Sequence, residues 1–111
     1  METNYSTIKD LSSDKPKVSI IIPAYREEKV IGGVVEKVRR VMDATGKSHE
    51  ILVVNDGSDD ETAAEAQKAG ARVISHPYNI GNGATIKTGI RHAKGKILIM
   101  MDGDGQHNPD D

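Results

Sequence analysis

Two carboxylates separated by one glycine, Asp102-Gly103-Asp104, directly follow an apolar run at residues 97–101. A buried strand that ends there would bring two acidic groups into one small volume, where like charges repel each other. A cation between them would relieve this repulsion, and oxygen ligands of this kind suit Mg²⁺ or Mn²⁺. The alternative is an ordinary polar turn, because Asp and Gly are both common in turns. These residues alone leave both interpretations open.

A second group of candidate residues follows the apolar run at residues 18–22. Pro23 and Ala24 are short enough to let a flat nucleobase approach the backbone. Tyr25 is either a ligand contact or an aromatic residue on the rim of a site. Glu27 either contacts a ligand or favours a helix N-terminus through the helix dipole.

Asp56 lies shortly after the apolar run at residues 51–54 and directly before Gly57. It is either a turn residue or a carboxylate that accepts a hydrogen bond from a nucleobase N–H. Among the histidines, His49, His76 and His92 have no paired ligand at a useful spacing, so we expect them on the surface. His107 lies close to the acidic pair, but its spacing assigns it no role.

The composition limits the function classes. The chain has 111 residues, enough for one domain, and a net charge of -2, so no strong basic field favours nucleic acid. Phe and Trp are absent, which also argues against base stacking on a nucleic-acid surface. The chain has no Cys, and therefore no disulfide, thiolate metal site or thiol nucleophile. We find neither an apolar signal segment nor an apolar run long enough to cross a bilayer.

Strands and helices are expected to alternate along the chain and to position these residues. Continuous apolar runs predict strands at residues 18–22, 51–54, 72–75 and 97–101. Such alternation indicates an α/β fold, a Rossmann-like parallel sheet with helices on both faces. Right-handed crossovers place the carboxyl ends of all strands on one edge, where open parallel sheets bind ligands.

Three helices are expected between these strands. The first begins near Glu28 and ends at Gly46, with an apolar face that includes Val30 and Val41. The second begins at the capping-box pattern of Ser58 and Glu61 and ends at Gly70. The third ends at Gly95, and its apolar positions predict that Ile86, Ile90 and Ala93 form its buried face.

Four motifs in order carry a resemblance to a known family. They lie at residues 18–27, 50–62, 79–84 and 101–107, and together they resemble the start of family 2 glycosyltransferases. Within that family the likeness is strongest to the dolichol-phosphate (polyprenyl-phosphate) mannosyltransferase group, and it spans residues 17–111. The resemblance implies a GT-A fold, a nucleotide-sugar donor of the GDP-mannose or UDP-glucose type, and Mg²⁺ or Mn²⁺ as cofactor. It also implies inverting, metal-dependent transfer to an acceptor such as a polyprenyl or dolichyl phosphate.

The resemblance also implies roles for individual residues. A nucleoside pocket would be lined by Pro23, Ala24, Tyr25 and Glu27, with Asp56 and the backbone of Val54 holding the base. The metal and the diphosphate would be bound by Asp102, Asp104 and Gln106, with the backbone of Met101 and Gly103 near the donor. No residue of this chain is assigned as catalytic, because a lipid phosphate acceptor is already anionic and needs little help from a general base.

Residues 1–16 are polar and lack periodicity, so we expect a flexible leader there. The resemblance implies that residues 17–111 form the nucleotide-sugar-binding part of a catalytic domain. The family's acceptor half would lie beyond Asp111. The expected location is the cytoplasm or the cytoplasmic face of a membrane, with peripheral membrane association through segments beyond this chain. One alternative is a non-catalytic nucleotide-sugar-binding fragment, inactive for lack of the acceptor half. A Rossmann oxidoreductase half is disfavoured, because Ile86 stands where the dinucleotide fingerprint needs its third glycine.

Overall fold

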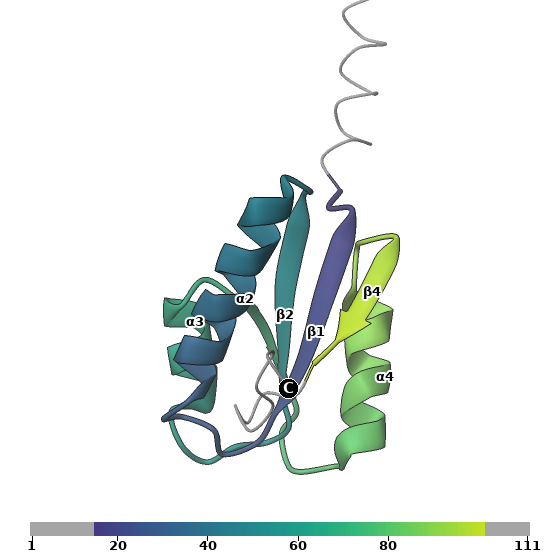
Figure 1. The fold of residues 1–111 in the computed structure, drawn as a ribbon. Helices are drawn as coiled ribbons and strands as arrows, with labels where there is room; N and C mark the ends of the chain where they lie inside the picture. Colours follow the sequence, from purple (N-terminus) through teal and green to yellow (C-terminus); the bar gives the residue numbers. More distant parts are fainter. Residues whose placement is uncertain (1–14, 102–111) are drawn as a thin grey trace, which may run out of the picture.

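Strands and helices alternate throughout the computed structural model, which describes residues 15–101 (Figure 1). The elements are β1 (Val18–Ala24), α2 (Ile31–Thr45), β2 (His49–Asn55), α3 (Thr62–Lys68), β3 (Arg72–Ser75), α4 (Asn82–His92) and β4 (Ile97–Met100). All four expected strands are present, and β1 and β2 extend beyond their predicted bounds. No helix among the described residues is long and apolar enough to span a membrane.

The four strands form one parallel sheet in the order β3-β2-β1-β4. Ile20 in the middle of β1 pairs with Ile51 of β2 and with Ile99 of β4. On the far side of β2, Val54 pairs with Ile74 of β3. Because every pair is parallel, the carboxyl ends of the strands share one edge of the sheet, as the sequence predicts.

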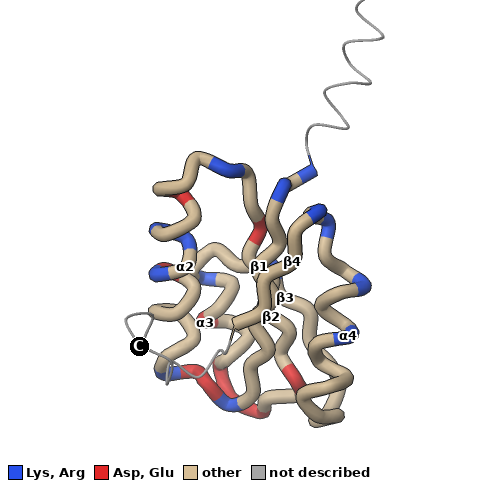
Figure 2. Tube along the Cα trace, turned by 45° about the vertical axis from the view of Figure 1, so that its right-hand side comes forward, with Lys and Arg blue, Asp and Glu red and all other residues tan. Residues whose placement is uncertain are grey.

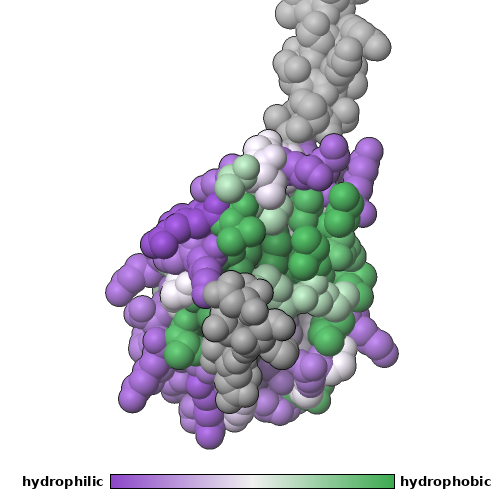
Figure 3. All heavy atoms as spheres, in the orientation of Figure 1, coloured by the Kyte–Doolittle hydropathy of each residue, from purple (hydrophilic) through white to green (hydrophobic). Residues whose placement is uncertain are grey.

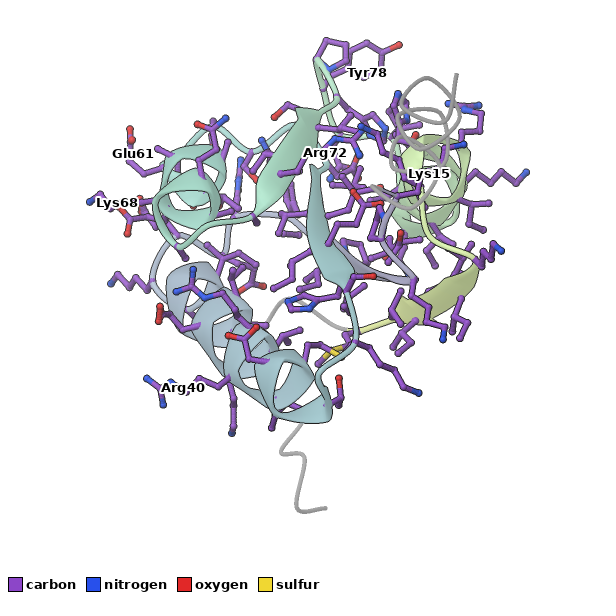
Figure 4. The ribbon with its side chains drawn as sticks, turned by 90° about the horizontal axis from the view of Figure 1, so that it is seen from above. Lys15, Arg40, Glu61, Lys68, Arg72 and Tyr78 are labelled. Atoms are coloured by element: carbon purple, nitrogen blue, oxygen red, sulfur yellow. The ribbon has the colours of Figure 1, made fainter. Side chains whose placement is uncertain are left out.

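Helices cover both faces of the sheet, with α2 and α3 on one side and α4 on the other (Figure 4). Alternate residues of each strand point to opposite faces, so β1 supplies both layers of the core. The layer under α2 and α3 contains the buried residues Val18, Ile20, Ile22, Ala24, Ile31, Val35, Val38, Met42, Ile51, Val53, Ala66 and Ala71. The layer on the α4 side is smaller, and its buried residues are Ile21, Leu52 and Val54.

The first two helices begin later than predicted. Helix α2 begins at Ile31 rather than near Glu28, and it ends as expected at Gly46, which adopts a left-handed conformation. Helix α3 begins at Thr62, so the predicted capping box at Ser58 is wrong. The Ser58 hydroxyl instead accepts a hydrogen bond from the backbone N–H of Arg26 at 2.8 Å. At the start of the helix, Oδ1 of Asp60 accepts a hydrogen bond from the N–H of Thr62 at 2.9 Å.

The buried face of α4 also differs from the prediction. Its buried residues are Thr85, Thr88 and Gly89, whereas Ile90 is 43% exposed. The helix lies so close to β1 that a Cβ atom on Gly89 would stand 2.4 Å from Cγ2 of Ile21. Small side chains permit this approach, and a search for apolar residues at helical spacing does not detect them.

Strand β4 forms an open edge of the sheet. Its four residues are each 37–46% exposed, so the expected buried strand is wrong. An apolar groove of about 560 Å³ lies between β4 and α2. Hydrophobic residues are exposed at the surface in this region (Figure 3). Its lining includes Val30 and Val41, which were expected on the buried face of α2 and are 37% and 60% exposed.

A polar cluster joins three elements at the amino end of the sheet. The buried Ser19 hydroxyl donates to Oε2 of Glu50 at 2.6 Å and accepts the N–H of Gly95 at 2.8 Å. Glu50 also accepts hydrogen bonds from Arg72 at 3.0 Å and from the backbone N–H of Lys94 at 2.7 Å. Burial raises the pKa of the Glu50 carboxyl, but these hydrogen bonds outweigh burial and lower the pKa below its ordinary value.

Candidate functional site

The loops that follow β1 and β2 are held together at the carboxyl edge of the sheet. Besides its N–H bond to Ser58, Arg26 forms a two-pronged ion pair with Asp59, with both N···O distances at 3.1 Å. The pair is exposed and contributes little stability, so its main effect is to fix the loop. Arg26 has a φ of 54°, and its guanidinium carbon lies 5.1 Å from the ring centre of Tyr25. Tyr25 is thereby held on the rim of the edge, 37% exposed.

Glu27 connects the same loop to two helices. Its backbone N–H donates to Oγ1 of Thr62 at 2.8 Å, and its carbonyl accepts the N–H groups of Val30 and Ile31. The residue therefore stands at the start of both α2 and α3. This position agrees with the expectation of a helix-start residue, while its contact with a nucleoside stays a prediction.

Among the described carboxylates at this edge, Asp56 is the most buried, with 5% of the residue exposed. Its Oδ1 accepts hydrogen bonds from His76 Nδ1 at 2.8 Å and from the N–H of Ile80 at 2.9 Å. Its Oδ2 accepts the N–H of Gly81 at 2.9 Å. Burial raises the pKa of the Asp56 carboxyl, but these three donors outweigh burial and lower its pKa below the ordinary value. Asp56 is therefore an anion that anchors the loop between β3 and α4.

His76 links Asp56 to helix α4, so the expectation that it lies on the surface is wrong. Its side chain is 10% exposed, and Nε2 lies 2.8 Å from the hydroxyl of Thr88. Because an ionised carboxylate only accepts hydrogen bonds, Nδ1 carries the proton in this arrangement. No sequence spacing identifies His76, because its partners stand 20 residues before it and 12 residues after it.

Gly57 brings the loop after β2 into contact with the loop after β3. Its φ of 73° lies in the left-handed region, which side chains with a Cβ atom rarely adopt. A Cβ atom there would stand 2.2 Å from the carbonyl carbon of Tyr78 and 2.5 Å from the nitrogen of Asn79. Tyr78 itself points outward from its loop (Figure 4) and is 67% exposed. Only glycine permits this close approach of the two loops.

These loops line an open pocket of about 270 Å³ at the carboxyl edge of the sheet. It is lined by Pro23, Ala24, Tyr25, Asp56, Asn79, Gly81, Asn82 and Thr85. The structure thus brings together four of the residues predicted for a nucleoside pocket. Glu27 and Val54 are not among the lining residues, and Val54 is fully buried within β2. Asn79, Asn82 and Thr85 were not predicted as site residues, although the first two lie within a motif that carries the family resemblance.

The predicted metal ligands Asp102, Asp104 and Gln106 lie outside the described residues, as does Gly103. Met101, the last described residue, donates its N–H to the carbonyl of Ile21 at 3.0 Å. Asp102 therefore follows a residue fixed at the carboxyl end of β4. Carboxylate and amide oxygens form a donor set that suits Mg²⁺ or Mn²⁺.

Acidic residues gather at the same end of the molecule, in the loops at the bottom of Figure 2. Within residues 15–101, however, no group of three or more His, Asp or Glu side chains is placed to hold a metal ion.

Comparison with known proteins shows the family. Residues 19–111 match the family described as Glycosyl transferase family 2. The chain belongs to this family of glycosyltransferases. Dolichyl-phosphate beta-glucosyltransferase ALG5D of Trichomonas vaginalis is 40% identical to it over 105 residues, which cover 83% of this chain and 32% of that enzyme. The chain spans 30% to 44% of the length of three curated relatives that it matches.

Solved structures agree on the fold. Mannosyl-3-phosphoglycerate synthase from Rubrobacter xylanophilus matches 91% of this chain with a TM-score of 0.74 at 23% identity, and the match covers 34% of that synthase. Glucosyl-3-phosphoglycerate synthase from Mycobacterium tuberculosis, in complex with Mn²⁺, UDP and phosphoglyceric acid, matches 88% of this chain at 26% identity and a TM-score of 0.68, covering 36% of that synthase. The same synthase is also known with Mg²⁺ and UDP. The parallel sheet and its helices are those of the nucleotide-binding half of a GT-A fold.

Proposed function

We propose that this chain binds the nucleotide-sugar donor of a glycosyltransferase that transfers the sugar to a polyprenyl-phosphate acceptor. The observation that carries the proposal is the pocket formed by Pro23, Ala24, Tyr25 and Asp56 at the carboxyl edge of the sheet. Open α/β sheets bind their ligands at this edge. The pocket's volume of about 270 Å³ fits the nucleoside end of a donor rather than the whole nucleotide sugar.

The lining residues supply complementary contacts for a nucleoside. Pro23 and Ala24 present little side chain, so a flat base can lie against the backbone of the loop. Tyr25, held by Arg26, offers an aromatic edge at the rim of the pocket. Asp56 is ionised and buried, and it can accept a hydrogen bond from an N–H group of the base.

The diphosphate of the donor needs positive charge near it, which the described lining residues do not supply. We assign the binding of Mg²⁺ or Mn²⁺ to Asp102, Asp104 and Gln106, with the backbone of Met101 and Gly103 near the donor. When bound, such a cation stabilises the negative charge on the departing nucleoside diphosphate. The synthase of Mycobacterium tuberculosis solved with Mn²⁺ and UDP supports the use of a divalent cation, while the residues that bind it are our proposal.

The names of the relatives support this acceptor class, and they include a dolichyl-phosphate glucosyltransferase and a dodecaprenyl-phosphate galacturonate synthase. An oxygen of the lipid phosphate would attack the anomeric carbon of the sugar, and the bond from that carbon to the nucleoside diphosphate would break. The attacking oxygen is already anionic, so the reaction needs no proton acceptor at that atom. A lipid acceptor would place the reaction at a membrane surface.

Calorimetric titration of the 111-residue chain with UDP-glucose and with GDP-mannose, in MnCl₂ and in EDTA, tests the proposal. We expect binding of at least one donor, weakened at least about tenfold by EDTA. Asp102→Ala should lose the metal-dependent part of binding, whereas Asp110→Ala, the matched loss of one carboxylate in the same segment, should retain it. Absence of binding to either donor would overturn the proposed function. Equal metal dependence in the two variants would remove Asp102 from the metal site.

A further inference from the structure

The number of hydrogen bonds on Asp56 limits what it can still bind. An ionised carboxylate has about four lone-pair positions, two on each oxygen. His76 and the N–H of Ile80 occupy both positions on Oδ1, and the N–H of Gly81 occupies one on Oδ2. Among the described residues no further donor reaches the Asp56 side chain, so Oδ2 keeps one acceptor position. Asp56 lines the pocket.

We propose that His76 is a positioning residue that leaves Asp56 able to accept one N–H donor only, so that the pocket selects uracil over guanine. The proposal rests on the proposed function, because it concerns the base of the same donor. Uracil presents a single N–H between two carbonyl groups on its pairing edge. Guanine presents two adjacent N–H donors there, which would need both oxygens of the carboxylate.

The two remaining bases differ from uracil at the same ring position. Cytosine and adenine present a ring nitrogen acceptor where uracil has its N–H, and an acceptor facing the Asp56 carboxylate is repelled.

His76 can hold Asp56 in one orientation because the imidazole is itself fixed at both nitrogens. Nδ1 donates to Asp56, and Nε2 meets the Thr88 hydroxyl of α4 at 2.8 Å. Thr88 is 6% exposed and belongs to the helix face packed on the sheet, so the support comes from the core. Without His76, Oδ1 would regain an acceptor position, and the carboxylate could turn to accept two donors from guanine.

Two substitutions test the hydrogen bonds of the two His76 ring nitrogens one at a time. His76→Asn keeps a side-chain N–H at the position of Nδ1, the same number of bonds from Cα, and can still donate to Asp56. His76→Gln places its amide at the position of Nε2, which keeps the contact with Thr88 and removes the donor to Asp56. The affinity of the 111-residue chain and of each variant is measured for UDP, for GDP and for UDP methylated at N3, in MnCl₂.

For the unmodified chain we expect UDP to bind at least about tenfold more tightly than both GDP and N3-methyl-UDP. His76→Asn should keep these preferences, and His76→Gln should reduce both to within about threefold. A general loss of stability would weaken the binding of all three nucleotides by the same factor and leave the ratios of their affinities unchanged. Thr88→Val keeps His76 but removes the hydrogen bond at its Nε2. This variant should partly reduce the preference for UDP, and it replaces His76→Gln in the test if that variant does not fold.

The outcomes distinguish this inference from the proposed function. Equal binding of UDP and GDP to the unmodified chain would overturn the selection of uracil and leave the proposed function standing. Unchanged ratios in the folded His76→Gln and Thr88→Val variants would remove His76 as a positioning residue. Failure of every nucleotide to bind the unmodified chain would overturn both.

Discussion

Substitution of Gly57 by alanine should damage the pocket and the fold together. The residue has a φ of 73°, and its added Cβ atom would stand 2.2 Å from the carbonyl carbon of Tyr78. Ordinary van der Waals contact begins at 3.4 Å, so the loop after β3 would have to retreat by about 1 Å. That loop also supplies the N–H groups of Ile80 and Gly81 to Asp56, and its retreat would lengthen both hydrogen bonds.

The magnitude follows from two costs. Left-handed backbone costs a residue with a Cβ atom roughly 1–2 kcal/mol, and overpacking against backbone atoms costs about 1–3 kcal/mol. We therefore expect Gly57→Ala to lower the free energy of unfolding by about 2–5 kcal/mol, or the melting temperature by about 10–25 °C. Nucleotide affinity should fall with it, because Asp56 loses its fixed orientation.

Urea unfolding and UDP titration of the 111-residue chain measure both effects. Gly33→Ala is the matched control, because Gly33 lies within α2 and a Cβ atom there meets nothing within 4 Å. The control should gain about 0.5–1 kcal/mol, since glycine is a poor helix residue. A Gly57→Ala variant within 0.5 kcal/mol of the unmodified chain, a margin typical of a neutral surface substitution, would refute the reasoning.

Two further predictions concern the packing of the sheet. Ser19→Ala removes the hydroxyl between Glu50 and the N–H of Gly95 and should lower the free energy of unfolding by about 1–3 kcal/mol. The lowered pKa of Glu50 means that its contribution is fully present above its ordinary pKa of 4.5 and is lost as pH falls through the lowered value. Acid unfolding followed by circular dichroism should therefore be less pH-dependent in Ser19→Ala, and an unchanged acid transition would contradict this account. Gly89→Ala should lower stability by about 1–3 kcal/mol, because its Cβ atom would meet Ile21 at 2.4 Å, and a neutral result in thermal unfolding would show that α4 can shift outward.

The fold was predictable where the chain relies on apolar periodicity. The β-branched runs that become β1 and β2 give both strands, and the alternation of strands with helices gives the parallel sheet. The buried face of α4 was not predictable in this way, because close packing requires small residues such as Thr85 and Gly89. The start of α3 was mispredicted because the Ser58 hydroxyl accepts a hydrogen bond from the backbone N–H of Arg26 in another loop. The local sequence does not reveal this tertiary contact.

The candidate site was predictable in part, for a similar reason. Residues that follow strands of a parallel sheet must share one edge, which brings Tyr25 and Asp56 together. The hydrogen bonds of His76 depend on how two loops and a helix meet, and no spacing along the chain encodes that meeting. The exposure of β4 was not predicted, because an apolar run does not indicate whether a helix covers the strand.

The central claim is that the pocket at the carboxyl edge holds the nucleoside of the donor. The most direct test is a titration of the ¹⁵N-labelled 111-residue chain with UDP in MgCl₂, in which the amide signal of each residue is followed. The account predicts saturable shifts at Ala24, Asp56 and Gly81, with Val41 and Ile99 in the apolar groove unchanged. Shifts confined to the groove, or no saturable shift at the pocket, would contradict it.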